Sequence, residues 1–212
     1  MYTDKPCQAL RFGDVVRGFV SVTPAIKVPF GTNDPYQFKV ELEDPAFHVL
    51  LSPCCSIGDK VVLLAPMSAV LHSFFDNPYF NEDLTRINRS MQPEMTLPPA
   101  AWDRLEPEEK QRRLAKGNGY TFLEWFVYAA HDLLPAYEVR RRNGERMRTN
   151  AYMIDFRHAF RVNCDAINTP QNAPLQAKVL ELTVAARSEL REKISYFYRR
   201  VPDEDVVEAL PA

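Results

Sequence analysis

The sequence predicts an α+β protein that begins with a barrel-like group of strands, continues with helices, and ends with a hairpin and a closing helix. Two patterns carry this prediction. The first 70 residues hold short apolar or alternating runs without a convincing helical repeat, whereas residues 183–200 place apolar side chains at helical spacing. The chain also has 17 prolines against 7 glycines, which is typical of a chain divided into many short elements.

The length, composition and net charge of the chain indicate a globular protein. With 212 residues, 46% of them apolar, the chain can bury a sizeable core without disulfides or a metal. The net charge of −2 argues against a nucleic-acid footprint over the whole surface, although it is compatible with a local basic patch. The sequence shows no signal peptide and no apolar run near the roughly 18 residues of a membrane span. We therefore expect a cytoplasmic protein without membrane contact.

We expect a single α+β domain with four successive parts. They are barrel-like strands in 1–72, a helical insertion in 73–117, strands and a hairpin in 118–168, and a loop and helix in 169–202.

The N-terminal part is predicted to contain four or five short strands, and residues 10–23 indicate a strand pair or one long bent strand. Residues 37–44 alternate between polar and apolar side chains, which indicates a half-buried strand. Residues 47–52 and 60–66 are short runs rich in valine and leucine, which favours central strands. Strands without a covering helix are best buried in a small barrel or a strongly bent sheet, which also limits open edges.

The middle of the chain is more helical. Acids followed by arginines predict a helix near residues 81–91, because this order suits the helix dipole. Pro107 near a first turn and Gly117 as a stop predict a second helix over 105–117. Residues 119–135 fit either type of element, and their threonine, aromatic and valine content favours a strand.

The C-terminal part carries the clearest local signals. The pair Asn143-Gly144 predicts a two-residue type I′ turn between extended arms. Apolar side chains at every second position from Tyr152 to Cys164 then predict one long strand, with His158 on its apolar face. A helix is expected over residues 183–200.

The buried stripe of the helix over residues 183–200 is expected to consist of Ala186, Leu190, Ile194, Phe197 and Val201. Arg187, Arg191 and Lys193 are expected elsewhere on this helix.

A basic strip crosses the predicted hairpin. Between residues 138 and 161, seven arginines stand against three acids. The arginines are Arg140, Arg141, Arg142, Arg146, Arg148, Arg157 and Arg161. Guanidinium forks suit phosphates and carboxylates, and Tyr137 and Tyr152 could stack on bases. We expect these arginines to bind a nucleic acid or an acidic protein; the simpler alternatives are a solvated hairpin tip or contact with the chain's own acidic tail.

Cys54 and Cys55 are adjacent between two apolar runs. A structural zinc site usually needs two spaced cysteine pairs, and a catalytic thiolate needs a basic neighbour; the sequence offers neither near these residues. We expect both cysteines at a turn between core strands, and we expect no metal and no cofactor. Together with His48 and His72 they are weak candidates for catalysis, because none of the four belongs to a known catalytic motif.

The N-terminal third also resembles a known family. Gly-Asp-Val-Val at residues 13–16, Val-Leu-Leu-Ser at 49–52 and Pro66 follow the order of motifs in the MazF/PemK toxin family. The resemblance implies an SH3-like barrel, sequence-selective endoribonuclease activity and an antitoxin partner. The family's catalytic arginine before the second motif corresponds here to residues 45–47, Pro-Ala-Phe.

Two functional hypotheses follow from these patterns. The first is a non-enzymatic interaction module of a bacterial multi-component system, which binds a protein or a nucleic acid through the arginine-rich hairpin. The alternative is an endoribonuclease of toxin–antitoxin type on a degenerate MazF/PemK-like barrel. In that case His48 or His72, with the loop around Cys54 and Cys55, would supply acid and base groups.

Overall fold

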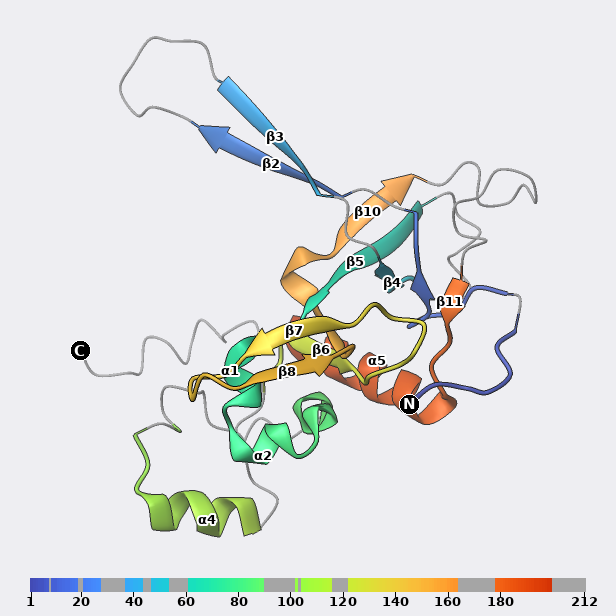
Figure 1. The fold of residues 1–212 in the computed structure, drawn as a ribbon. Helices are drawn as coiled ribbons and strands as arrows, with labels where there is room; N and C mark the ends of the chain where they lie inside the picture. Colours follow the sequence, from blue (N-terminus) through green and yellow to red (C-terminus); the bar gives the residue numbers. More distant parts are fainter. Residues whose placement is uncertain are drawn as a thin grey trace. The chain divides into compact units, whose positions relative to one another are not determined.

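A computed structural model describes most of the chain. The described residues are 1–7, 9–18, 21–27, 37–43, 47–53, 61–89, 102, 104–115, 122–163 and 178–199. Helices and antiparallel strands both contribute, which confirms the α+β class (Figure 1). Within the described residues, no helix combines the length and the apolar character needed to cross a membrane.

The chain divides into two compact units, each assembled from segments that are distant in sequence. We call them the sheet unit, formed by residues 2–68 and 158–182, and the hairpin unit, formed by Met1, 69–157 and 183–212. The single domain expected from the sequence stays a prediction.

An antiparallel sheet forms the centre of the sheet unit. Its strands are β1 (Val15–Val16), β4 (His48–Leu50), β5 (Val61–Ala69), β10 (Phe160–Asn163) and β11 (Lys178–Leu180). Their order is β11-β1-β4-β5, and β10 also pairs with β5. The sheet buries Val16, Leu50, Val62 and Leu64, so the two central strands expected from valine and leucine content are confirmed.

The described strands form open sheets, and they do not show the SH3-like barrel. Strands β2 (Ser21–Lys27) and β3 (Gln37–Glu43) were expected to belong to that barrel. Among the described strands they pair only with each other, as an antiparallel ribbon.

The hairpin unit combines short helices with two pairs of strands. Its helical elements are α1 (His72–Phe75), α2 (Pro78–Asn81), the 3₁₀-helix η2 (Leu84–Asn88), α4 (Pro107–Ala115) and α5 (Val184–Arg199). Its strands are β6 (Trp125–Tyr128), β7 (Tyr137–Arg140), β8 (Arg146–Thr149) and β9 (Tyr152–Asp155). β6 pairs with β9 and β7 with β8, both antiparallel. The strand within residues 119–135, the hairpin, the helix over 105–117 and the closing helix are thereby confirmed.

Two of the expected helices and strands are wrong, and in both cases an aspartate explains the difference. Instead of a helix over 81–91, the chain forms α2 and then η2, because the Asp83 carboxylate accepts hydrogen bonds from the Thr85 N–H and hydroxyl at 2.9 and 2.6 Å. Instead of one strand over 152–164, a 3₁₀-helix at Phe156–His158 separates β9 from β10. There the Asp155 carboxylate accepts from the Arg157 N–H at 2.9 Å, which turns the backbone.

Candidate functional site

The turn of the β7–β8 hairpin differs from the expected two-residue type I′ turn. Arg140 pairs with Arg146, the Arg141 N–H donates to the Glu145 carbonyl at 2.9 Å, and the Gly144 N–H donates to the Arg141 carbonyl at 3.0 Å. Gly144 has φ +85. These features describe a three-residue loop that ends in a left-handed glycine, which is the next most common hairpin connection.

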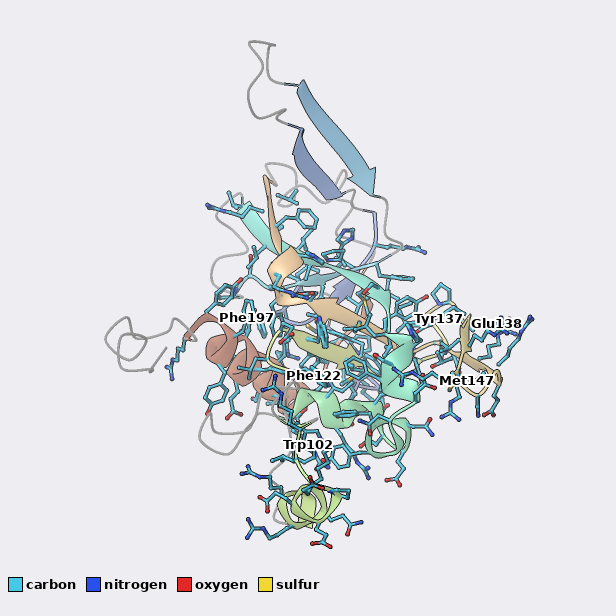
Figure 2. The ribbon with its side chains drawn as sticks, turned by 90° about the vertical axis from the view of Figure 1, so that its left-hand side faces the viewer. Trp102, Phe122, Tyr137, Glu138, Met147 and Phe197 are labelled. Carbon is cyan, nitrogen blue, oxygen red and sulfur yellow. The ribbon has the colours of Figure 1, made fainter. Side chains whose placement is uncertain are left out.

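The two strands of the hairpin have an inward and an outward face. Val139 is buried and packs in the core of the hairpin unit. The half-buried Tyr137 and Met147, both labelled in Figure 2, pack against the same core. The outward face carries four exposed charged side chains. They are Glu138, Arg140, Arg146 and Arg148.

Charges on this outward face are poorly balanced. Arg140 lies directly opposite Arg146, and Glu138 lies opposite Arg148. Like charges directly opposite each other destabilise a strand pair. The only described ion pair on this face joins Arg146 Nη1 to Glu138 Oε2 at 3.9 Å, between side chains that are 74% and 70% exposed. An exposed pair of this kind contributes little stability.

The turn itself is held against α1. The Arg141 guanidinium donates to the Phe75 carbonyl at 2.8 Å and to the Glu145 carboxylate at 3.2 Å. The backbone N–H of Arg142 donates to Asp76 Oδ1 at 3.0 Å. Hydrogen bonds from Asn143 and from Arg141 lower the pKa of the Glu145 carboxyl, so it stays ionised beside these partners.

A cavity of about 350 Å³ lies where the turn meets α1 and α2. Its lining consists of Phe75, Asp76, Asn81, Arg141, Arg142 and Asn143. Two arginines and one aspartate give this lining a formal charge of +1. The Arg142 side chain is 82% exposed, so it is accessible to a ligand, and its Nε lies 3.8 Å from Asp76 Oδ2.

Two of the seven predicted binding arginines lie elsewhere. Arg157 makes an ion pair with Asp155, with Nη2 2.5 Å from Oδ2, so its charge is already neutralised. Burial raises the pKa of Asp155, but hydrogen bonds from Arg157 and Trp125 together with the charge of Arg157 lower it overall. Arg161 is on β10, in the sheet unit. Arg140, Arg142, Arg146 and Arg148 are the exposed predicted arginines of the hairpin strands and turn.

The weak catalytic candidates are not brought together. His48 is completely buried on β4, where its ring meets Phe160 at 5.6 Å between centroids. His72 is exposed at the start of α1, in the hairpin unit. Cys54 and Cys55 lie outside the described residues. In the described part of the chain, no group of three or more His, Cys, Asp or Glu residues could hold a metal ion.

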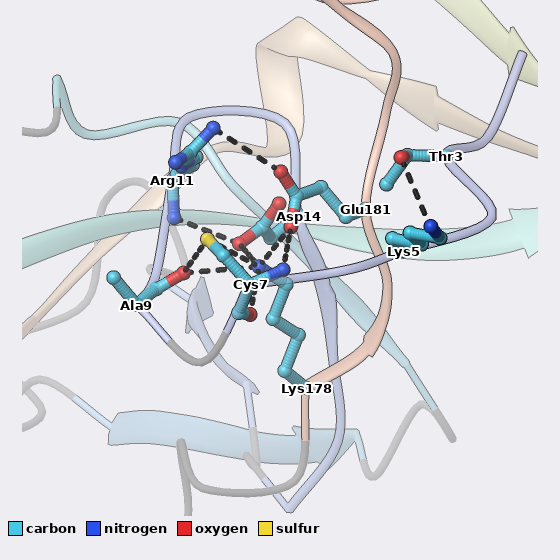
Figure 3. A network of polar contacts seen from close by, with 8 residues as sticks. All are labelled: Thr3, Lys5, Cys7, Ala9, Arg11, Asp14, Lys178 and Glu181. Carbon is cyan, nitrogen blue, oxygen red and sulfur yellow. Dashed lines mark hydrogen bonds and ion pairs between the residues drawn. The ribbon is translucent and has the colours of Figure 1, made fainter.

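A second polar cluster, in the sheet unit, was missed by the sequence analysis (Figure 3). Lys178 Nζ lies 2.8 Å from Asp14 Oδ2 and 2.7 Å from Glu181 Oε2, and it also donates to the carbonyls of Cys7 and Ala9 at 3.0 and 2.9 Å. Both carboxylates are buried. The residues come from two segments at opposite ends of the sequence, residues 7–14 and 178–181, so no motif or spacing reveals the cluster.

The cluster ties the N-terminal segment to β1 and β11. The Cys7 N–H donates to Glu181 Oε2 at 2.8 Å, and the Arg11 N–H donates to Asp14 Oδ2 at 2.7 Å. Burial tends to raise the pKa of Glu181, but the hydrogen bond from Lys178 and the one from the Cys7 backbone lower it to about 2. Lys178 and the backbone N–H groups of Cys7 and Arg11 all donate within the cluster, which indicates a structural role.

Comparison with known protein families, with characterised proteins and with solved structures found no match for this chain.

Proposed function

We propose that this protein is a non-enzymatic interaction module that binds an anionic partner, either an acidic protein or a nucleic acid, through the outward face of the β7–β8 hairpin. The observation that supports it most directly is the pair Arg140 and Arg146, which face each other across the two strands on the exposed side. Within the described residues, no carboxylate lies at ion-pair distance from Arg140 or Arg148.

Such an arrangement weakens the hairpin in isolation, because two like charges repel across the strands. A polyanion that lies on this face relieves the repulsion, and planar guanidinium groups can hold carboxylates or phosphates with two hydrogen bonds each. The core contacts of Val139 on the inward face keep the hairpin in place. Two like charges opposite each other conflict with the stability of the strand pair, and conflicts of this kind are expected at functional sites.

The proposal is tested by the double substitution Arg140→Glu with Arg146→Glu. Fluorescein-labelled octaglutamate and a twelve-nucleotide single-stranded RNA serve as probes, read by fluorescence anisotropy at low and at physiological salt. The matched control is Arg104→Glu with Arg112→Glu, which changes the net charge equally at exposed positions outside the hairpin. We expect loss of binding in the hairpin variant alone. Equal loss in both variants, or no binding of either probe by the wild type, would overturn the proposal.

The second proposal carried by the sequence is an endoribonuclease on an SH3-like barrel of the MazF/PemK type. What supports it here is that His72, one of the candidate imidazoles, is exposed. The buried position of His48 makes it a poor acid or base for a substrate in solution. Incubation of a labelled RNA with the wild type and with His72→Ala tests this directly: cleavage by the wild type that the variant lacks would favour the nuclease over the module.

A further inference from the structure

We infer that the partner of the hairpin is an acidic protein segment, and that the cavity at the hairpin turn receives one of its carboxylates between Arg142 and Asn81. This inference rests on the proposed function and narrows it in two ways. It selects the protein over the nucleic acid, and it adds a specific anchor point to a charged face.

The aromatic rings near the hairpin are used inside the protein. The Tyr137 hydroxyl accepts from the Val70 N–H at 2.8 Å and donates to the Ala151 carbonyl at 2.6 Å. The Tyr152 hydroxyl donates to the Pro135 carbonyl at 2.9 Å. The two rings pack edge to face, 5.4 Å apart. Proteins that bind single-stranded nucleic acids stack bases on exposed aromatic faces, and these two rings are committed to each other and to the core.

The charges on the hairpin also favour a polypeptide. Glu138 and Glu145 are exposed among the arginines, and both would repel a backbone that carries a phosphate at every nucleotide. An extended peptide can instead place carboxylates opposite arginines and neutral residues opposite the glutamates. Arg146 and Arg148 are two residues apart on one strand, a distance of about 7 Å, which is also the repeat between alternate side chains of an extended peptide.

The cavity offers donors to a carboxylate. The Arg142 guanidinium is mostly exposed, and its 3.8 Å separation from Asp76 is too long for a hydrogen bond. Asn81 is exposed at the end of α2, and its side-chain amide has no hydrogen-bond partner among the described residues. The Nε–H of Arg141 is buried without a hydrogen-bond partner and is one more donor in the wall, while the charge of Arg141 is paired with Glu145 at 3.2 Å. Donors thus outweigh the one opposing carboxylate, that of Asp76.

Asp76 makes the inference testable, because removal of its negative charge should strengthen the binding of an anionic peptide. Asp76→Asn keeps the oxygen that accepts from the Arg142 N–H and removes the negative charge. If the cavity receives a carboxylate, labelled octaglutamate should bind this variant roughly threefold to fivefold more tightly, the size of one partly exposed charge interaction. Asn81→Ala should weaken binding by a similar factor. Asp132→Asn, at an exposed site of the same unit, is the matched control and should leave affinity unchanged.

Each result separates the inference from the proposal on which it rests. Suppose that Arg140→Glu with Arg146→Glu abolishes binding. If octaglutamate then binds Asp76→Asn more weakly, or binds both cavity variants as it binds the wild type, the hairpin remains the binding face and the carboxylate anchor is excluded. Tighter binding of the twelve-nucleotide RNA than of octaglutamate at equal salt would identify a nucleic acid as the partner and overturn the inference. Absence of binding to either probe would overturn both. Thermal melting of each variant verifies that the fold is retained.

Discussion

Lys193 of α5 is completely buried, and its ammonium group donates a hydrogen bond to the backbone carbonyl of Ile87 in η2. Burial lowers the pKa of this lysine to about 7, although Glu124 and Glu189 act in the opposite direction. The contact joins the closing helix to a short 3₁₀-helix of the hairpin unit, and it buries a group that prefers water when charged.

The first prediction concerns pH. Above about pH 7 the folded protein holds Lys193 neutral, whereas the unfolded chain keeps it charged up to its ordinary pKa of 10.5. Unfolding therefore takes up a proton between these values, and the free energy of unfolding should rise as pH increases from 7 towards 10. Lys193→Met should remove this slope and add a few kcal/mol of stability at pH 7. Urea unfolding at several pH values measures both; an unchanged slope in the variant would contradict the prediction.

The second prediction separates the structure of the hairpin from its binding. The Tyr137 hydroxyl links the Val70 N–H to the Ala151 carbonyl, and burial raises its pKa to about 12, so it remains a neutral donor at physiological pH. Tyr137→Phe leaves both backbone groups without this partner and should cost about 1–3 kcal/mol of unfolding free energy. Affinity for octaglutamate should stay within twofold. A large loss of affinity with unchanged stability would place the tyrosine in the binding face.

Strand alternation accounts for what the sequence could and could not reveal about the site. Seven arginines are visible from composition, but only those with the parity of Arg140 and Arg146 point outward on the strands. Arg141 has the opposite parity and turns inward to the Phe75 carbonyl. The assignment of Arg157 failed for another reason, since Asp155 both breaks the strand and neutralises that arginine.

Several elements with regular apolar patterns were predictable, whereas contacts between distant segments were not. The apolar runs of β4 and β5 and the stripe of α5 with Ala186 and Leu190 follow from periodicity alone. Lys193 was expected outside the stripe because lysine is rarely buried, and nothing near it in sequence indicates the carbonyl that it meets. The cavity likewise joins a turn to two helices some sixty residues earlier.

The third prediction tests the turn. Gly144 has φ +85, a conformation that side chains with a Cβ rarely adopt, while a Cβ there would meet nothing within 4 Å. Gly144→Ala should therefore destabilise the protein through backbone strain alone, by about 1 kcal/mol. Chemical denaturation gives the value. Gly144→Asn is the control and should lose less, because asparagine tolerates the left-handed region better than alanine. An equal loss in both variants would mean that strain at this residue is not the cause.

The fourth prediction concerns the sheet unit. Lys178 compensates the buried carboxylates of Asp14 and Glu181, so Lys178→Met should cost about 3–5 kcal/mol, the usual effect of leaving a buried charge without its partner. The same contact makes the wild type sensitive to acid. Since the folded pKa of Glu181 is about 2, below its ordinary value of 4.5, its contribution is present above pH 4.5 and is lost as pH falls towards 2. Acid titration followed by circular dichroism should show the variant unfolding at a higher pH than the wild type. Lys110→Met, which removes one positive charge on α4 in the hairpin unit, should unfold like the wild type, and coincident curves for both variants would contradict the assigned role of Lys178.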